Sequence, residues 1–418
     1  MKSAYDVLVL GGGPAGATVA IRLAMAGWSV AVVERQAFPR RKVCGECVAA
    51  SNLPLLDALG LGTAFASLAG PPLTAMQVVA GASDVTAALP AATGTHPWGR
   101  ALGRDCLDTL LLDRAAAAGA HVWQPWTAKT LARDGVRHVC RLLGAGGRSA
   151  QVEAPLLVRA HGSWEPEPSA GARPHRRRGS DLFAFKQTLQ GSGLAPGLLP
   201  VLAFAGGYGG MVVGEHGTTT LAFCIRRDVL QAQRRRHPGA RAAAAALAHV
   251  EAQCPRVREV LAEARVAGPW LGVGPLRPGI RAPWRDDGSF AVGNAAGEAH
   301  PILGEGISMA MQSAWLLADA LAARQTGVRG AQLPPAAHQD AGRAYARQWH
   351  RQFAGRIRFA ALCAHLAMRP VAGHLLLPAL HAWPGVLTRG ARLAGKVRAL
   401  PPASHRHHAV PRQEEATP

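Results

Sequence analysis

The first 35 residues alternate between short apolar runs and one glycine-rich turn. Residues 5–10 (YDVLVL) are almost entirely apolar, which predicts a strand buried on both faces. Residues 14–26 carry small and apolar side chains that predict a helix, and Gly27 lies where that helix should end. Residues 28–33 (WSVAVV) predict a second buried strand. A strand, a helix and a strand in this order predict a βαβ unit.

The turn inside this unit has the spacing GxGxxG. Gly11, Gly13 and Gly16 follow the first strand, and Glu34 ends the second. Such glycines allow a tight turn, close approach of the backbone to a pyrophosphate, and close packing of helix on strand. The helix N-terminus favours phosphate charge, and Glu34 can accept hydrogen bonds from a ribose. We therefore predict a site for FAD or NAD rather than NADP, formed by Gly11, Gly13, Pro14, Ala15, Gly16, Glu34 and Arg35.

A different pattern begins near residue 180. Residues 180–189 (SDLFAFKQTL) and 198–230 contain alternating apolar positions between glycine turns, which predicts antiparallel strands. Few charged residues occur in these strands, so we predict an apolar substrate, either a polyketide or an isoprenoid-like molecule. The candidates for contact with it are Phe183, Phe185, Tyr208 and Met211, and packing in the core is an equally good explanation for each aromatic residue.

Residues 289–321 (SFAVGNAAGEAHPILGEGISMAMQSAWLLADAL) place a strand, a glycine-rich turn and a long helix in succession. Together with the GxGxxG turn, this stretch resembles the second FAD motif of one superfamily. It contains the aromatic-ring hydroxylases (group A flavin monooxygenases), the flavin-dependent halogenases and the geranylgeranyl reductases. Asn294 replaces the family's usual Asp, but its side-chain oxygen can still bond a ribityl hydroxyl. The resemblance implies that the dinucleotide is FAD, with further contacts from Asn294, Pro301, Gly304, Gly306 and Ile307.

Two other segments agree with this resemblance. Residues 103–122 (GRDCLDTLLLDRAAAAGAHV) resemble the segment in which an arginine near a helix start reaches the cofactor, which implies this role for Arg104; a solvated surface arginine is the alternative. Residues 156–164 (LLVRAHGSW) resemble the family's Asp-Gly motif, with His161 in place of the Asp. Because that Asp is associated with both FAD and nicotinamide handling, the exchange bears on NAD(P)H docking. A core histidine is the alternative explanation.

Residues 41–48 (RKVCGECV) place Cys44 and Cys47 in a CxxC spacing. A zinc site would need two further ligands, and no second CxxC or close histidine pair lies nearby in the sequence. A redox dithiol is also conceivable, but flavin disulfide reductases use a wider spacing and a second GxGxxG. Residues 38–46 (FPRRKVCGE) resemble the loop beside the isoalloxazine ring in the reductase and halogenase branches. This resemblance implies that Cys44 and Gly45 lie against the flavin and that no metal is bound.

Composition changes this interpretation little. The net charge of +20 comes almost entirely from arginine, which accompanies abundant Ala, Gly and Pro and indicates codon bias. No basic run is interleaved with aromatic residues, so we expect no nucleic-acid partner. Seven scattered cysteines and an apolar N-terminal strand, without a signal-peptide pattern, favour a cytoplasmic location. Residues 340–400 predict cationic amphipathic helices that contact a membrane surface or cover the pocket, with simple helix packing as the commoner explanation.

We therefore predict an α/β fold of discontinuous domains. Residues 1–180 and 268–330 form a Rossmann-like FAD-binding domain, and residues 181–267 form an inserted antiparallel β-sheet substrate domain. Residues 331–400 form C-terminal helices, and residues 401–418 form a disordered tail. The resemblance does not fix the oligomeric state.

The first functional hypothesis is an FAD-dependent monooxygenase that uses NAD(P)H as electron donor and O₂ to hydroxylate an apolar molecule. The alternative is a reductase that passes a hydride to a carbon–carbon double bond, as in geranylgeranyl reductases. A halogenase is less favoured, because the sequence has no Trp-x-Trp-x-Ile-Pro segment and Lys186 is the only lysine between residues 130 and 395. A remote alternative is a basic binding protein without enzymatic activity. No catalytic acid or base can be named from the sequence.

Overall fold

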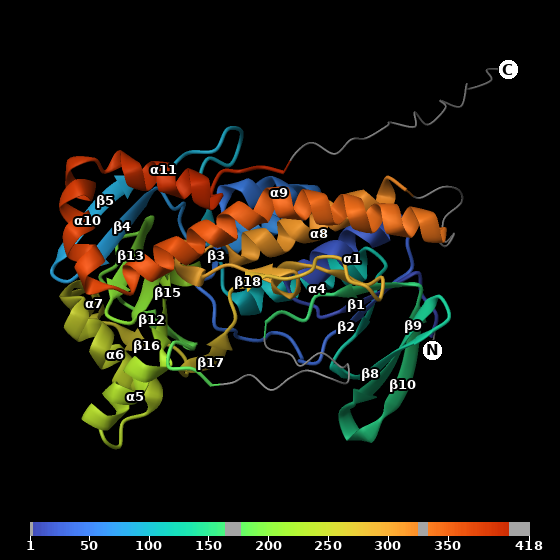
Figure 1. Cartoon of the computed structure of the whole chain (residues 1–418), viewed down its shortest axis with the longest axis horizontal. Coiled ribbons are helices and arrows are strands. Elements are labelled where there is room, and N and C mark those ends of the chain that lie inside the picture. The colour runs from blue at the N-terminus through green and yellow to red at the C-terminus, as the bar shows by residue number, and fades with distance from the viewer. Residues whose placement is uncertain (1–2, 164–176, 325–332, 401–418) are drawn as a thin grey trace.

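The computed structural model describes residues 3–163, 177–324 and 333–400; the predicted tail lies outside these residues. Five short strands form a parallel sheet in the order β19–β11–β1–β2–β7 (Figure 1). The strands are β1 (Val7–Leu10), β2 (Val30–Val33), β7 (His121–Trp123), β11 (Leu156–Arg159) and β19 (Phe290–Ala291). Helix α1 (Pro14–Met25) connects β1 to β2, which confirms the predicted βαβ unit.

Both faces of the parallel sheet are covered, which explains why its central strands are entirely apolar. Helices α1, α4 (Arg104–Ala117) and α8 (Gly306–Ala322) pack together on one face. The other face packs on a three-stranded antiparallel sheet of β8 (Trp126–Asp134), β9 (Arg137–Gly144) and β10 (Ser149–Ala154). The parallel sheet and these layers form the predicted FAD-binding unit.

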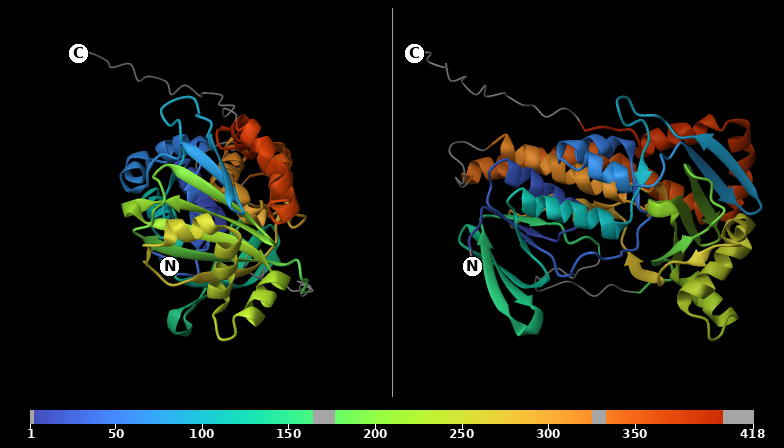
Figure 2. Two further views of the ribbon diagram at one scale, coloured as in Figure 1. Left: turned by 90° about the vertical axis from the view of Figure 1, so that its left-hand side faces the viewer. Right: turned by 180° about the vertical axis from the view of Figure 1, so that it is seen from behind.

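A second, larger sheet lies at the opposite end of the molecule (Figures 1 and 2). Its strand order is β16–β12–β15–β14–β13–β4–β5, and β17 also pairs with β12. The strands are β4 (Ala75–Ala80), β5 (Ser83–Ala88), β12 (Leu182–Gln190), β13 (Leu198–Phe204), β14 (Gly207–Val213), β15 (Thr219–Arg226), β16 (Arg265–Val266) and β17 (Leu271–Leu276). The antiparallel strands predicted in residues 180–189 and 198–230 are confirmed: β13 pairs with β14, β14 with β15, and β15 with β12, each pair antiparallel.

The predicted boundaries of this sheet, residues 181–267, are too narrow. Strands β4 and β5 come from the range that was assigned to the FAD-binding domain, and β17 follows residue 267. Strand β4 pairs with β13 in parallel, with Ala75 opposite Leu198 and Ala80 opposite Ala203. This pairing joins residues about 120 positions apart, so no local sequence pattern predicts it.

Helices cover the outer face of the second sheet. They are α5 (Arg227–Arg236), α6 (Ala242–Gln253) and α7 (Pro255–Leu261), which account for the basic, alanine-rich stretch of the sequence. Ala246 and Val250 of α6 are fully buried in one cluster with Phe204 and Phe223 of the sheet. The opposite face of the sheet is therefore the one that turns toward the FAD-binding unit.

Three C-terminal helices connect the two units. Helix α9 (Pro335–Ala367) packs along α8 and continues to β13 and β14, while α10 (Pro370–Ala382) and α11 (Gly385–Ala394) lie beside β4 and β5 (Figure 1). In the described part of the chain, no single helix has the length and apolarity to cross a bilayer, and α9 with residues 371–382 passes that test only as a sharply bent pair.

Short elements complete the described part of the fold: β3 (Cys47–Val48), α2 (Leu53–Ala58), α3 (Gly62–Leu68), β6 (Arg100–Ala101), β18 (Gly279–Ile280) and β20 (Gly297–Glu298).

Candidate functional site

A cavity of about 590 Å³ runs from the glycine-rich turn before α1 to the inner faces of the C-terminal helices. Its volume is in the range of small-molecule sites in proteins. Most residues predicted to contact the cofactor line it, namely Gly11, Gly13, Pro14, Ala15, Glu34, Cys44, Gly45, Arg104, Asn294, Pro301, Gly304, Gly306 and Ile307. Two predicted contacts, Gly16 and Arg35, do not line it.

The glycines of the first turn have different tasks. A Cβ at Gly16 would lie 1.8 Å from the carbonyl oxygen of Gly11, so Gly16 lets α1 pack directly on the turn. Gly11 has a φ of +108°, which favours glycine. At Gly13 a Cβ would meet no atom closer than 3.7 Å, so its backbone is open to the cavity. Arg35 is exposed outside the lining, because it follows the end of β2.

Glu34 is held rigidly at the end of β2. Its carboxylate accepts hydrogen bonds of 2.9 Å from the backbone N–H groups of Gly12 and Gln36. The guanidinium of Arg40 lies 3.5 Å from the same carboxylate, and both side chains are buried. This fixed acceptor beside Gly13 agrees with the predicted ribose contact.

Three cations border the same end of the cavity. Arg104 begins α4 and donates to both carboxylate oxygens of Asp108, at 2.7 and 2.8 Å, and Arg40 lies 3.4 Å from Asp108. Lys42 also lines the cavity; burial, followed by repulsion from Arg104 and Arg40, lowers its pKa to about 8. An anion such as a pyrophosphate would relieve this repulsion, so the cluster suits a dinucleotide.

The second motif meets the cavity at the start of α8. Gly304 has a φ of +63°, and a Cβ at Gly306 would meet nothing within 4 Å, so the first N–H groups of the helix are open to the cavity. Asn294 also lines the cavity and donates from Nδ2 to the hydroxyl of Ser163 at 2.8 Å. Open glycine backbone at two helix starts, a ribose acceptor and a cation cluster together fit FAD.

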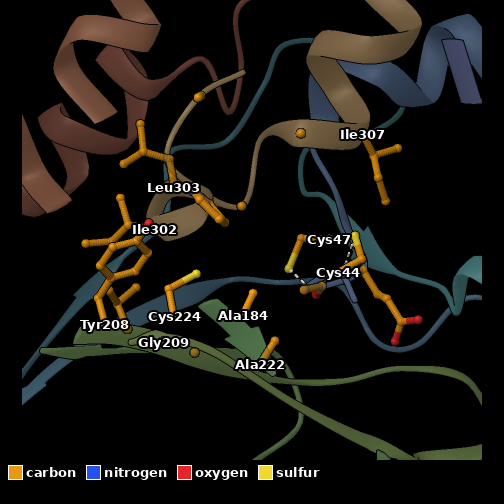
Figure 3. A pocket seen from close by; sticks show the side chains of 18 of the residues that line it. Cys44, Cys47, Ala184, Tyr208, Gly209, Ala222, Cys224, Ile302, Leu303 and Ile307 are labelled. Atoms are coloured by element: carbon orange, nitrogen blue, oxygen red, sulfur yellow. Dashed lines mark hydrogen bonds between the residues drawn. The ribbon is translucent and has the colours of Figure 1, made fainter. Parts of the chain in front are cut away.

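The CxxC loop lies between the two motifs. Both cysteines are free thiols that line the cavity (Figure 3). Cys44 Sγ accepts the N–H of Glu46 at 3.3 Å, and Cys47 Sγ donates to the carbonyl of Gly45 at 3.3 Å. Burial raises the pKa of Cys47 to about 11, so this residue is a thiol rather than a thiolate. A Cβ at Gly45 would meet nothing within 4 Å, which leaves room for a flat ring against this loop.

Sequence reasoning missed the ion pair that holds this loop. Glu46 has a φ of +58°, unusual for a residue with a side chain, and its buried carboxylate accepts hydrogen bonds from Lys186 Nζ and from Thr220 Oγ1 at 2.6 Å. The backbone N–H of Arg104 also donates to it at 3.0 Å. Lys186 is buried in β12, so the pair joins the FAD-side loop to the substrate sheet. The sequence does contain one sign of this pair, a lysine inside the apolar run LFAFKQTL, because a buried lysine needs a partner.

The substrate sheet contributes one wall of the cavity. Figure 3 shows Ala184, Ala222 and Cys224 directed from β12 and β15 toward the turn that contains Ile302 and Leu303. Of the predicted substrate contacts, Phe185, Tyr208 and Met211 line the cavity and Phe183 does not. Side chains alternate along a strand, so Phe183 and Phe185 belong to the cluster under the outer helices and Ala184 takes the inner position. Phe185 borders the cavity as well as this cluster, whereas Phe183 does not reach the cavity. The prediction of Phe183 as a substrate contact is therefore not supported.

Tyr208 places a buried phenol hydroxyl, hydrogen-bonded to a histidine, in this wall of the cavity. It is 1% exposed, and its hydroxyl forms a 3.0 Å hydrogen bond with Nδ1 of His300. Burial raises the pKa of Tyr208 well above its usual value, and burial lowers the pKa of His300 to about 4. Both side chains are therefore neutral near pH 7. His161 also lines the cavity, with Nδ1 3.1 Å from the carbonyl of Gly162.

The far end of the cavity is apolar and lies under the C-terminal helices. Its walls come from β4, β13, α9, α10 and α11, and include Met76, Val78, Leu199, Val201, Phe359, Leu366, Leu377, Leu380, Leu387 and Ala391. These helices thus cover the pocket, as one of the sequence-based alternatives expected. The individual residues were not predicted, because β4 lies far from β13 in sequence and the helices have apolar residues on more than one face.

Known proteins resemble this chain in sequence and fold. A family model described as FAD binding domain matches residues 4–351. A menaquinone reductase of Mycobacterium tuberculosis is 31% identical over 172 residues, 41% of each chain, and a tryptophan 2-halogenase of Chondromyces crocatus is 45% identical over 60 residues, 14% of this chain and 11% of that one. The chain thus aligns with well under two thirds of these relatives. The solved structure of the flavin-dependent brominase Bmp2 matches 94% of both chains with a TM-score of 0.75 and 20% identity, which shows a shared fold.

Proposed function

The chain belongs to the FAD binding domain family, and we propose that it is a flavin-dependent oxidoreductase that reduces a carbon–carbon double bond in an elongated, isoprenoid-like substrate. The reaction adds a hydride to one carbon of the double bond and a proton to the other. FAD, when bound and reduced, supplies the hydride. The chain must supply the proton, and it must hold the double bond in an apolar space.

Tyr208 is the observation that carries this proposal. Its phenol lies in the wall of the cavity, near the turn that contains Pro301, and burial keeps it protonated. A neutral phenol can give a proton to the second carbon as the hydride reaches the first. Hydroxylation, the first hypothesis from the sequence, gives this group no obvious task, so we place reduction ahead of it.

The remaining residues bind and orient. Glu34 and the cations Arg40, Lys42 and Arg104 would hold the ribose and pyrophosphate of FAD, and the start of α8 at Gly306 would face the flavin. The apolar wall under α9 to α11 would exclude water and hold the chain of the substrate. A relative named a menaquinone reductase aligns with 41% of this chain, which is in keeping with an apolar substrate.

We expect the purified, FAD-loaded protein to reduce the isoprenoid alcohol geranylgeraniol under strictly anaerobic conditions. Dithionite, NADH and NADPH would be compared as electron donors, because the proposal keeps NAD(P)H as the natural donor. The measurement is the mass of the product, which should contain two additional hydrogen atoms and no additional oxygen. A product that contains oxygen, and that forms only after air is admitted, would instead establish a monooxygenase.

We also propose that the outer face of α10 and α11 rests on an anionic membrane surface, from which an apolar substrate would enter. Val371, Leu375 and Trp383 are 67–72% exposed, and Val386 and Leu393 are more than half exposed. Arg369, Arg389 and Arg392 are exposed around them. The inner sides of the same helices line the cavity, so the surface and the substrate site are adjacent.

The double variant Leu375→Ser/Trp383→Ser should bind vesicles of phosphatidylglycerol and phosphatidylcholine about 30-fold more weakly, a loss of about 2 kcal/mol from the removed apolar area. Co-sedimentation measures the bound fraction. Val266→Ser is the matched control, because Val266 is 69% exposed in β16, away from these helices. Equal binding by all three proteins would exclude this face as the docking surface.

A further inference from the structure

A path of polar side chains leads from the cavity to the surface behind Tyr208. The Tyr208 hydroxyl contacts Nδ1 of His300 at 3.0 Å, and the ring of His300 lies edge-to-face against the ring of His365, with centroids 5.9 Å apart. Exposure rises along this path: Tyr208 is 1% exposed, His300 is 9% exposed, and His365 on α9 is exposed to solvent. The three rings come from β14, from the residue before the Pro301 turn, and from α9.

The hydrogen bonds of the two histidines indicate which ring nitrogens carry hydrogen along this path. Nδ1 of His365 lies 2.7 Å from the carbonyl oxygen of Ala361, one helical turn earlier, so this nitrogen carries a hydrogen and Nε2 is left to exchange protons with water. When Nδ1 of His300 carries the hydrogen, it donates to the Tyr208 oxygen, which leaves the phenol hydrogen to point elsewhere. With the ring centroids 5.9 Å apart, proton transfer between the two imidazoles would require one bridging water molecule.

We propose that His300 and His365 form a proton relay that reprotonates Tyr208 from solvent after each reduction, an inference that rests on the proposed function. In each cycle the phenol O–H bond of Tyr208 breaks and its proton forms a C–H bond in the substrate. His365 takes a proton from water at its free Nε2 and passes it to Nε2 of His300, while the Nδ1–H of His300 moves to the Tyr208 oxygen. One proton thus enters the protein for each one delivered, and the hydride comes from reduced FAD. Proton exchange through water then returns His300 to its Nδ1–H form before the next cycle.

The neighbourhood of the relay supports proton transfer through neutral groups. His300 is too buried to stay charged, and its pKa of about 4 reflects this burial first and the adjacent His365 second. Among the residues that the structure describes, Cys224 and Glu298 are the other titratable side chains that act on Tyr208, and burial raises the pKa of both. Cys224, with a pKa of about 12, keeps its own proton near pH 7. Imidazole is the group here that can accept a proton at one nitrogen and release another from the opposite nitrogen.

The test compares the first turnover with later turnovers. Reduced, FAD-loaded protein is mixed anaerobically with geranylgeraniol, and flavin reoxidation reports the first turnover; product formed in excess dithionite reports the later ones. Because Tyr208 begins with its proton, His365→Gln should leave the first turnover near the wild-type rate and slow later turnovers about tenfold. Imidazole added to the buffer should restore most of the lost rate. In His300→Gln the amide can still form a hydrogen bond with Tyr208 but cannot pass on a proton. This variant should also keep the first turnover and slow the later ones.

His381→Gln is the matched control. His381 is also on a C-terminal helix and also has Nδ1 near the carbonyl of the residue four positions earlier, at 3.0 Å. It has no place in the path, so it should behave as the wild type. A readout that needs no bound FAD is the ¹⁵N shift of the His300 ring in the full chain, which should change in Tyr208→Phe.

The outcomes separate the relay from the proposed function. If wild-type protein makes reduced product but His365→Gln equals it in all turnovers, the relay is wrong and the reductase stands. If His365→Gln slows the first and later turnovers equally, without imidazole rescue, the histidine is structural and the relay is wrong. If wild-type protein makes no reduced product with any of the three electron donors, the proposed function fails, and the relay fails with it.

Discussion

The Gly13→Val protein is expected to fold and to be purified without bound FAD. In the wild-type chain, the position of a Cβ at Gly13 is open, with the nearest atoms, in the guanidinium groups of Arg104 and Arg40, at 3.7 Å. The Cβ of a valine there would therefore clash with no protein atom, and its methyl groups would extend into the space that the pyrophosphate needs. Overpacking of about 3 kcal/mol corresponds to an affinity loss of at least about 100-fold.

Two other glycines make this experiment specific. Gly16→Ala would place a Cβ 1.8 Å from the Gly11 carbonyl oxygen, so it should destabilise the fold itself. Gly355 lies on α9, where a Cβ would meet nothing within 4 Å, so Gly355→Val should keep both fold and flavin. Thermal unfolding and flavin absorbance per protein, measured on all three variants, separate loss of binding from loss of structure. Normal flavin content in Gly13→Val would show that the GxGxxG turn is not the cofactor site.

The parts of the fold that were predicted correctly are those with a local signature. The βαβ unit has its apolar strands, its glycine turn and its terminal Glu34 within 35 residues, and the second motif has its turn and helix within 33 residues. In both motifs the backbone adopts conformations that favour glycine, such as the positive φ at Gly11 and Gly304, so the glycines in the sequence mark these turns. For this reason, most of the predicted cofactor contacts line one cavity.

The substrate side was predicted less well, because its geometry depends on distant pairings. The alternating pattern of β12 was recognised, but the sequence does not tell which of its two faces turns inward, so Phe183 was chosen and Ala184 was missed. Strand β4 joins β13 across about 120 residues. The Tyr208–His300 contact joins residues 92 positions apart and needs both units to be in place. Long-range contacts of this kind carry no signal in a single sequence.

Lys186→Met should destabilise the folded protein by about 3–5 kcal/mol, a prediction that also depends on a long-range contact. The exposed fractions of the Lys186 and Glu46 side chains are only 3% and 6%, so solvent would not replace the lost cation. Thr220 and the backbone N–H of Arg104 would still donate to Glu46, but neither carries a compensating charge. Glu46 also holds a φ of +58°, so releasing its carboxylate should let the loop relax away from the cavity.

The measurement is denaturant unfolding of the FAD-free proteins, so that loss of cofactor does not contribute. Lys129→Met is the matched control: Lys129 is exposed on strand β8, and its replacement should change stability by less than about 0.5 kcal/mol. The double variant Lys186→Met/Glu46→Gln should recover much of the loss, because it removes the unpaired buried charge. If Lys186→Met is as stable as Lys129→Met, the pair does not hold the CxxC loop on the substrate sheet. The placement of Cys44 and Gly45 beside the flavin would then have to depend on other contacts of the loop.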